Sequence, residues 1–341
     1  MTDRRRRTTL RDVATAAGVS VKTVSRVVNG EPGVAPAVRE RVTVVVTQLG
    51  YRPDLGARTL RRSDRRSASI ALLLEDLANP YSAALLRAVE DVARPRAVVV
   101  LAASLDEDPS RERALAAAFG SRSVDGLVLA PAGDDQSHLA EEIEAGTAVV
   151  CVDRAPTGID VDTVVSTDAA GVAEGVSHLV AHGHHRIAFL GDLATIATAR
   201  LRHDGYRAGL AGAGLPYDPQ LVVRDVHADT AVEAAIESLL ALPDPPTAVF
   251  GAQNLITAGL VRALRSRDLH HRIALVGYDD FLFADLLSPA VTVVAQDPGL
   301  IGRTAVALLF DRIDGDRSAP RTVEIPTRLL VRGSGELPPH R

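Results

Sequence analysis

The chain of 341 residues has few residues that are reactive or aromatic. It contains one cysteine, one methionine and no tryptophan, and aromatic residues make up only 3%. The single cysteine, Cys151, excludes a disulfide bond within the chain, and its apolar surroundings, AVVCVD, predict a small buried side chain. No apolar stretch reaches the roughly 18 residues of a membrane-spanning helix. The N-terminal arginines are not followed by the apolar segment of a secretory signal, so the sequence predicts a cytoplasmic protein without a membrane partner.

Charge is distributed unevenly along the chain. Residues 1–66 hold 15 Lys and Arg against 6 Asp and Glu, whereas the remaining residues hold 23 against 37. Only one basic residue is a lysine, Lys22, and it lies in the basic head. The length and the 46% of hydrophobic residues indicate two or three globular domains. A basic head on an acidic body predicts that the head binds a polyanion.

The head has the pattern of three short amphipathic helices. Residues 9–12, TLRD, have the spacing of a helix-opening pair, and Gly18 follows where a helix ends. Ser20 caps a second helix over about 21–29, and a third begins near Pro36. Two helices joined by a glycine-centred turn predict a helix-turn-helix. Apolar residues recur at helical spacing on one face of each helix: Leu10, Val13, Ala14 and Ala17; Val21, Val24, Val27 and Val28; Val38, Val42, Val45 and Leu49.

The second helix of such a unit lies in the major groove of DNA. Lys22 and Arg26 are four residues apart, so they share the helix face opposite the valines. Lysine or arginine donating to guanine is the commonest specific base contact. Thr23, Ser25 and Asn29 are short polar residues suited to phosphate contacts. The alternative is that Lys22 and Arg26 form only a solvated helix face.

A long run in the head, TLRDVATAAGVSVKTVSRVVNGEPGVAPAVRERVTVVVTQLGYRPDLGARTL, resembles the DNA-binding head of the LacI/GalR repressor family. The resemblance implies that Val21, Lys22 and Arg26 recognise bases, with Val21 limited to thymine methyl groups or sugar carbons. Thr9 joins them among the expected DNA-binding residues. We therefore expect a helix-turn-helix DNA-binding domain over residues 1–52.

Residues 53–66 are expected to form a hinge helix and linker between the head and the body. The segment RPDLGARTL resembles the hinge helix of the same family, which forms on DNA and pairs with its dimer mate in the minor groove. Leu60 matches a leucine that wedges into a base step, and Arg58 is assigned to the same DNA contact. The alternative is that Leu60 packs on the body as an ordinary linker residue.

The body, residues 67–341, alternates apolar strand-like runs with helical segments. This alternation predicts parallel sheets covered by helices on both faces. Two such lobes would place a ligand cleft between them, at the carboxyl ends of the strands. Strands are expected at 69–74, 97–102, 126–129, 148–152, 164–166, 186–190, 221–223, 248–250 and 273–278. Helices are expected at 81–93, 111–120, 169–181, 201–213, 230–241 and 256–267.

The family resemblance extends through the body to about residue 335, on segments such as LEDLANPYSAALLRAVED, VVCVDR, TARLRHDGYRAGL and ALVGYDDF. The body is similar to periplasmic sugar-binding proteins, with two α/β lobes, three crossovers and a ligand between the lobes. The resemblance implies that lobe one holds about 67–165 with 295–325, and that lobe two holds about 166–290 with 326–341.

The effector pocket of that family implies a set of ligand-binding residues in this chain: Tyr81, Asp168, Arg202, Gln253 and Asp279. Arg202 would grip the ligand and Asp279 would accept its hydroxyl groups, which suits a polar, sugar-like molecule. Two positions depart from the family pattern: Gln253 replaces a frequent asparagine, and Val226 stands where some relatives place an aromatic residue. The alternative is that the charged residues form surface or interlobe ion pairs.

Together these features predict a dimeric repressor that binds a palindromic operator and responds to a small polar effector such as a carbohydrate, without a cofactor. Two half-sites one helical turn apart require a two-fold homodimer. Two alternatives remain, an enzyme and a small-molecule receptor without DNA recognition. The sequence lacks a G-x-S-x-G or P-loop motif. His182, His184 and His185 have no carboxylate at metal-ligand spacing, which indicates turn and cap residues.

Overall fold

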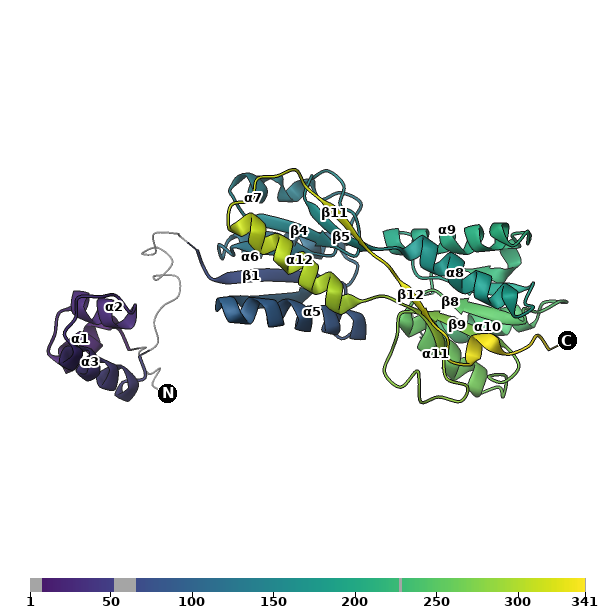
Figure 1. The fold of residues 1–341 in the computed structure, drawn as a ribbon, viewed down its shortest axis with the longest axis horizontal. Helices are drawn as coiled ribbons and strands as arrows, with labels where there is room; N and C mark the ends of the chain where they lie inside the picture. Colours follow the sequence, from purple (N-terminus) through teal and green to yellow (C-terminus); the bar gives the residue numbers. More distant parts are fainter. Residues whose placement is uncertain (1–7, 52–65, 227–228, 341) are drawn as a thin grey trace, which may run out of the picture. The chain divides into compact units, whose positions relative to one another are not determined.

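The computed structural model describes residues 8–51, 66–226 and 229–340. The chain divides into two compact units, Met1–Ser67 and Ala68–Arg341 (Figure 1). The described part of the first unit contains the helices α1 (Leu10–Ala17), α2 (Val21–Val28) and α3 (Pro36–Gln48). The second unit contains two α/β lobes, each built on a six-stranded sheet.

Local sequence explains how the helices of the first unit begin and end. The Thr9 hydroxyl accepts from the amide of Asp12, and the Asp12 carboxylate accepts from the amide of Thr9, so the expected helix-opening pair is a capping box. Gly18 ends α1 with a left-handed φ of 63°. The three helices then pack around a small core in which Val13, Val24 and Val42 are fully buried.

One residue of the first unit that was expected to face inward is exposed. Leu49, expected to face inward, is 40% exposed, because α3 ends at Gln48 and Leu49 is its C-cap. The chain then turns at Gly50, with φ of 59°, and Tyr51 packs against the core instead. Val21 is also 40% exposed, since it lies in the first turn of α2, beyond the core contact that Val24 makes.

Lobe one is a parallel sheet with helices on both faces. Its strand order is β11-β5-β4-β3-β1-β2. Helices α5 and α12 pack on one face, against the alternate side chains Ile70, Leu72 and Leu74, and α6 packs on the other. The elements are β1 (Ser69–Leu74), α5 (Pro80–Ala93), β2 (Val99–Ser104), α6 (Pro109–Gly120), β3 (Gly126–Leu129), α7 (Ala140–Glu144), β4 (Ala148–Val152), β5 (Asp162–Ser166), α12 (Pro298–Ile313) and β11 (Thr322–Ile325).

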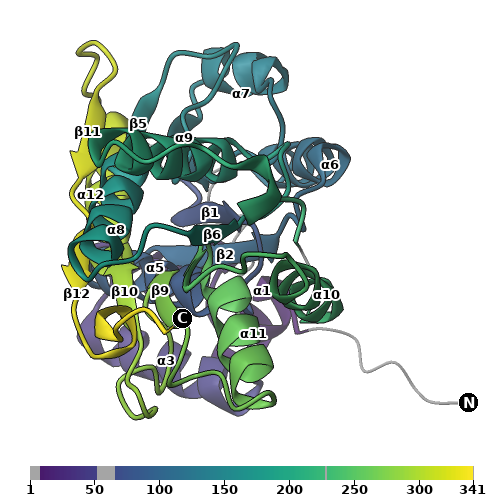
Figure 2. The ribbon, with the colours of Figure 1, turned by 90° about the vertical axis from the view of Figure 1, so that its right-hand side faces the viewer.

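Lobe two repeats this architecture with the order β12-β10-β9-β8-β6-β7, in which only β12 is antiparallel to its neighbour. Helices α8 and α9 cover one face, and α10 and α11 cover the other (Figure 2). The elements are α8 (Asp168–Ala181), β6 (Ile187–Leu190), α9 (Ala197–Gly212), β7 (Val222–Val223), α10 (Asp229–Leu240), β8 (Ala248–Gly251), α11 (Asn254–Arg265), β9 (Ala274–Tyr278), β10 (Thr292–Ala295) and β12 (Arg328–Leu330).

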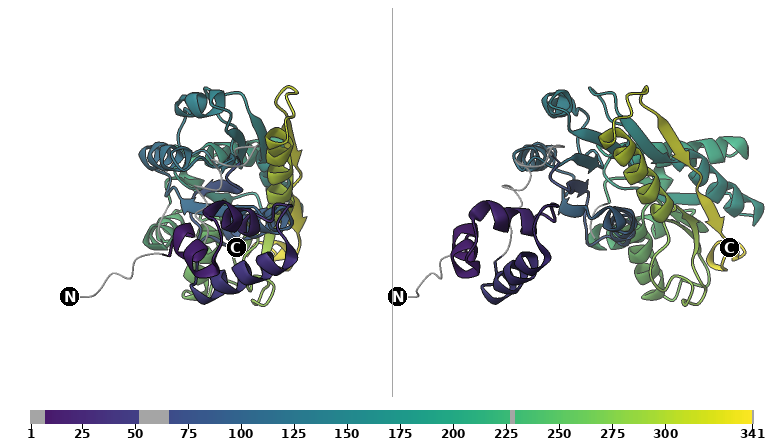
Figure 3. Two further views of the ribbon diagram at one scale, coloured as in Figure 1. Left: turned by 90° about the vertical axis from the view of Figure 1, so that its left-hand side faces the viewer. Right: turned by 60° about the vertical axis from the view of Figure 1, so that its left-hand side comes forward.

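The chain crosses between the lobes three times. The crossings follow β5, β10 and β11, near residues 167, 296–297 and 326–327. The last crossing is the yellow C-terminal segment in Figure 3. The two-lobed α/β body with parallel sheets and the helical head confirm the fold class expected from the sequence.

Several element bounds differ from the expectation. Strand β2 begins at Val99 rather than at residue 97, because a 3-10 turn over Arg94–Arg96 ends on Ala97 with φ of 56°. Helix α9 begins four residues early, at Ala197. Helices α7 and α12 and strands β10 and β11 were not expected from the sequence. Within the described residues, no helix is long and apolar enough to cross a membrane.

Candidate DNA-binding surface and interlobe pocket

Helix α2 buries one face and exposes the other. Val24 is fully buried in the core of the first unit, whereas Lys22 is exposed and the Arg26 side chain is 43% exposed. The Nε atom of Arg26 lies 3.8 Å from the Glu31 carboxylate, but no ion pair joins Lys22 to another described residue. The structure therefore places both basic side chains, together with exposed Val21, on the outside of the second helix.

The short polar residues of this helix bond mainly to one another. The Ser20 hydroxyl accepts from the amide of Thr23, and Asn29 Nδ2 donates to the Ser25 hydroxyl over 3.3 Å. The Thr9 hydroxyl belongs to the capping box of α1, so a DNA contact from it would share that hydroxyl with the cap. Arg58 and Leu60, the expected minor-groove residues, lie in 52–65, outside the described residues.

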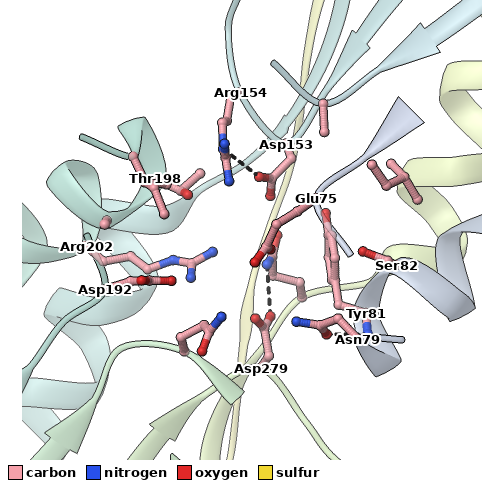
Figure 4. A pocket seen from close by; sticks show the side chains of 16 residues that line it. Glu75, Asn79, Tyr81, Ser82, Asp153, Arg154, Asp192, Thr198, Arg202 and Asp279 are labelled. Carbon is pink, nitrogen blue, oxygen red and sulfur yellow. Dashed lines mark hydrogen bonds and ion pairs between the residues drawn. The ribbon is translucent and has the colours of Figure 1, made fainter. Parts of the chain in front are cut away.

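A polar pocket lies between the lobes of the second unit (Figure 4). Its cavity has a volume of about 40 Å³, which is room for a few water molecules. Its polar residues follow the carboxyl ends of parallel strands in both lobes, where open α/β sheets bind ligands. They include Glu75 after β1, Asp153 after β4, Asp192 after β6, Gln253 after β8 and Asp279 after β9.

Four of the five expected effector residues line this pocket: Tyr81, Arg202, Gln253 and Asp279. The fifth, Asp168, does not line it. Asp168 is 2% exposed and lies behind Arg202, whose Nε donates to it over 2.7 Å. Arg202 also donates to the carbonyl of Ala252, and its guanidinium stacks 4.0 Å from the ring centroid of Tyr278. Asp168 therefore holds the guanidinium of Arg202 from behind the pocket lining.

Two lining groups have no hydrogen-bond partner among the described residues. The Tyr81 hydroxyl is buried and unpaired, and no hydrogen bond joins the Gln253 side-chain amide to another described residue. Burial raises the pKa of the Tyr81 phenol well above its usual value, so the phenol remains a donor. Since buried polar groups are nearly always paired, the Tyr81 hydroxyl fits a ligand that completes its hydrogen bonds.

Several lining residues were not expected from the sequence, among them Glu75, Asp153, Arg154 and Asp192. Arg154 Nη1 donates to Glu107 over 2.6 Å, and its Nε lies 3.2 Å from the Asp153 carboxylate. Asp153 and Arg154 lie in the segment VVCVDR, directly after strand β4. The rule that ligands bind at strand carboxyl ends could have identified them.

The pocket contains more acidic than basic side chains. Glu75, Asp153, Asp192 and Asp279 line it, against two lining arginines: Arg202 is paired with Asp168, and Arg154 is paired with Glu107 and with Asp153. Burial raises the pKa of Glu75 to about 7, with repulsion from Glu107 adding to the shift. Burial likewise raises the pKa of Asp279 to about 6, against the attraction of Arg202. The pocket therefore disfavours an anionic ligand.

The histidine cluster and the cysteine lie away from this pocket. His182 is the C-cap of α8, and buried His184 bonds to the Thr247 hydroxyl and to the carbonyl of Leu337. The thiol of Cys151 is fully buried, as expected, and burial raises its pKa well above the usual value. Among the described residues, no group of three or more His, Cys, Asp or Glu side chains could hold a metal ion.

A helix-turn-helix unit joined to a two-lobed body with a pocket between the lobes defines a ligand-responsive DNA-binding transcription regulator. Residues 9–54 match the family model for bacterial regulatory proteins of the lacI family, and residues 176–335 match a periplasmic binding protein-like domain. The chain is 35% identical to the HTH-type transcriptional regulator CelR of Thermobifida fusca, over 98% of this chain and all of that protein. The chain therefore belongs to the lacI family of bacterial regulatory proteins.

Solved structures support the same assignment. A complex of the transcriptional regulator CelR with cellobiose matches with a TM-score of 0.71 at 32% identity, covering 96% of this chain and all of that chain. The Lac repressor dimer bound to operator and the anti-inducer ONPF matches with a TM-score of 0.83 at 26% identity, covering 97% and 99%.

Proposed function

We propose that the protein is a dimeric repressor that binds a palindromic operator and whose operator affinity is controlled by an uncharged, polyhydroxylated ligand such as a sugar. The observation that carries the proposal is the pocket between the lobes, in which unpaired hydrogen-bonding groups and an excess of carboxylates face a common space.

The DNA contact is assigned to the exposed face of α2. Lys22 and Arg26 would donate to guanine, and exposed Val21 would contact a thymine methyl group or sugar carbons. Thr23, Ser25 and Asn29 would contact phosphates. Arg58 and Leu60 of the expected hinge helix remain part of this proposal for the minor groove.

The chemistry of the pocket favours a neutral ligand with several hydroxyl groups. Sugar hydroxyls can donate to Asp279 and Glu75 and accept from Arg202 and Tyr81, whereas a phosphate would meet a lining with more carboxyl groups than arginines. The CelR relative, whose structure was determined with cellobiose, agrees with this class of ligand. The deep burial of Cys151 and the absence of a nucleophile motif favour a binding protein over an enzyme, located in the cytoplasm with its DNA.

Homodimer formation is supported by an apolar loop on lobe two. Leu282, Phe283 and Leu286 follow β9 and are 72%, 59% and 74% exposed, which is unusual for clustered large apolar side chains on a free surface. A two-fold contact through this loop would use the same surface on both protomers. The alternative, a receptor without DNA recognition, would leave the basic face of α2 without a role.

Selection of bound duplexes from a random DNA pool, at fixed salt with the full-length protein, tests the proposal. We expect a palindromic consensus with two half-sites, since a two-fold dimer presents two heads. Recovered sites are then titrated in the presence of neutral sugars and of sugar phosphates. A change in operator affinity with neutral sugars alone supports the proposed effector class, whereas no consensus at any sugar concentration contradicts specific DNA recognition.

A further inference from the structure

A series of hydrogen-bonded side chains connects the pocket to the segments that cross between the lobes. Its central residue is Gln296, which lines the pocket and directly follows β10, at the second crossing. Gln296 Nε2 donates to Asp279 Oδ1 over 2.8 Å, and Gln296 Oε1 accepts from the Ser166 hydroxyl. Ser166 is the last residue of β5, directly before the first crossing. The Gln296 amide therefore joins a pocket carboxylate of lobe two to the first crossing.

The first and third crossings are bonded to each other. Thr167 directly follows Ser166, and its hydroxyl accepts from the amide of Thr327 over 3.0 Å. The two threonine hydroxyls lie 3.2 Å apart, and the Thr167 amide donates to the carbonyl of Ile325 over 3.2 Å. The hydrogen bonds that begin at the pocket therefore reach all three crossings. We name this set the crossing network: Asp279, Gln296, Ser166, Thr167 and Thr327.

The two partners of Gln296 determine the direction of its side-chain amide. An ionised carboxylate can only accept, so Asp279 takes the NH₂ group, and the Ser166 hydroxyl donates to the amide oxygen. Asp279 and Ser166 are each 7% exposed, so water competes little for these bonds. The bond to Asp279 is charge-assisted, which makes it about twice as strong as a neutral one. Its strength therefore depends on how much negative charge remains on Asp279 Oδ1.

The second oxygen of this carboxylate faces the pocket side of the network. No hydrogen bond joins Asp279 Oδ2 to another described residue, and Asp279 lines the pocket. A ligand hydroxyl that donates to Oδ2 draws charge away from Oδ1, so the bond from Gln296 weakens. Because hydrogen bonds in a series polarise one another, the bond between Gln296 and Ser166 weakens with it.

We propose that Gln296 is the positioning residue that transmits ligand binding at Asp279 to the three crossings, and through them to operator affinity. This inference rests on the proposed function, because it assumes an operator whose binding responds to the pocket. Binding and response are then separable: the ligand contacts Asp279, whereas Ser166, which does not line the pocket, carries the response to the crossings.

Two substitutions alter the two ends of the network separately. Asp279→Asn removes the charge, keeps the size of the side chain and suits the left-handed φ of 65° at this position. Ser166→Ala removes the bond to Gln296 and leaves the pocket lining unchanged. Ser177→Ala is the matched control, because Ser177 is exposed on α8 and its hydroxyl donates to the carbonyl of Ala173 in the same helix.

A double-mutant cycle on the full-length protein measures the coupling between these ends. Affinity for the palindromic duplex recovered by selection is measured by fluorescence anisotropy at fixed salt and about pH 8, where Asp279, with a pKa of about 6, is ionised. We expect Asp279→Asn alone to change operator affinity at least about fivefold, and less than about twofold when Ser166→Ala is also present. With Ser177→Ala the full effect of Asp279→Asn should remain.

Gln296→Met, which removes both hydrogen bonds of the amide, is a second test and should likewise abolish the effect of Asp279→Asn. An effect of Asp279→Asn that is the same with and without Ser166→Ala and Gln296→Met, or no effect in any background, overturns the role of Gln296 and leaves the proposed function intact. A selection that recovers no palindromic duplex overturns the proposed function and this inference with it.

Discussion

Asn79 of lobe one and Asn254 of lobe two form a reciprocal amide pair across the cleft. Asn254 Nδ2 donates to Asn79 Oδ1 over 2.8 Å, and Asn79 Nδ2 donates to Asn254 Oδ1 over 3.4 Å. Asn79 is only 5% exposed and Asn254 only 1%. Each side-chain oxygen also accepts a hydrogen bond from a backbone amide in the first turn of a helix. Asn79 Oδ1 accepts from the amide of Tyr81 in α5, and Asn254 Oδ1 accepts from the amide of Leu255 in α11. The pair therefore joins the helix starts of the two lobes.

Loss of this pair should open the cleft. Asn254→Ala removes both interlobe hydrogen bonds and leaves the buried Asn79 amide unpaired, which should destabilise the closed arrangement by about 1–3 kcal/mol. We expect a larger radius of gyration in small-angle X-ray scattering of the ligand-free variant. Asp134→Ala is the control, because its interlobe ion pair with Arg200, at 3.4 Å, is exposed and contributes only about 0–1 kcal/mol. Identical scattering of Asn254→Ala and the unaltered protein would show that other contacts hold the lobes together.

The buried pair of Arg202 and Asp168 should separate stability from ligand response. Arg202→Ala removes the partner of a carboxylate that is 2% exposed, and breaking a buried ion pair typically costs about 3–5 kcal/mol. We expect a large loss of the free energy of unfolding in urea. The double variant Arg202→Met with Asp168→Asn removes both charges and should recover most of it.

Neither variant should respond to the effector, because the guanidinium that faces the pocket is absent in both. Operator affinity measured with and without ligand gives this second readout. A double variant that regains both stability and ligand response would mean that Arg202 is structural and does not contact the ligand.

Most strands of the two sheets could be predicted from the sequence because each buried parallel strand is a short apolar run, but α7, α12, β10 and β11 were not expected. The residues of the candidate site could be predicted only in part. Tyr81, Arg202, Gln253 and Asp279 were found through the family resemblance and line one pocket. Glu75 could have been found as well, since it directly follows the strand expected at 69–74.

Contacts between distant segments could not be predicted in this way. Asn79 and Asn254 are 175 positions apart, and nothing in either local sequence specifies the other as its partner. The packing of α8 against α9 likewise brings Asp168 to Arg202, 34 positions away, which neither local sequence specifies. Periodicity indicates which face of a helix is buried, whereas the partner of a buried polar group depends on how the elements pack.

Lys22 should determine operator sequence preference. Lys22→Ala should weaken binding to the selected operator by about 1–3 kcal/mol and relax the preference at one base position. Arg41→Ala, an exposed residue of α3, is the control for loss of one positive charge, and should weaken all duplexes alike. Repeating the duplex selection with both variants measures the effect. If Lys22→Ala reduced binding to random and selected DNA equally, base recognition by Lys22 would be excluded.

Glu31 should restrain Arg26 in the free protein. The Glu31 carboxylate lies 3.8 Å from Arg26 Nε, and both side chains are about half exposed, at 50% and 43%. Glu31→Gln removes an acidic group beside the DNA-binding face, so operator affinity should rise and rise more at low salt. Fluorescence anisotropy titrations at several salt concentrations check this. Unchanged affinity at low salt would indicate that Arg26 already points at the DNA independently of Glu31.

Glu75 should make the stability of the body depend on pH near neutrality. Burial and the carboxylate of Glu107 raise its folded-state pKa from 4.5 to about 7, while Arg154 opposes the shift and Asp153 and Asp192 add to it. A carboxyl whose pKa is raised by folding binds its proton more tightly in the folded state. The contribution of this proton to the free energy of unfolding is therefore complete below about pH 4.5 and is lost as the pH rises to about 7.

Glu75→Gln mimics the protonated form, so its melting temperature should match that of the unaltered protein near pH 5 and exceed it near pH 8. Thermal denaturation across this range, without ligand, measures the difference. A constant offset between the two proteins at every pH would mean that Glu75 does not titrate in this window.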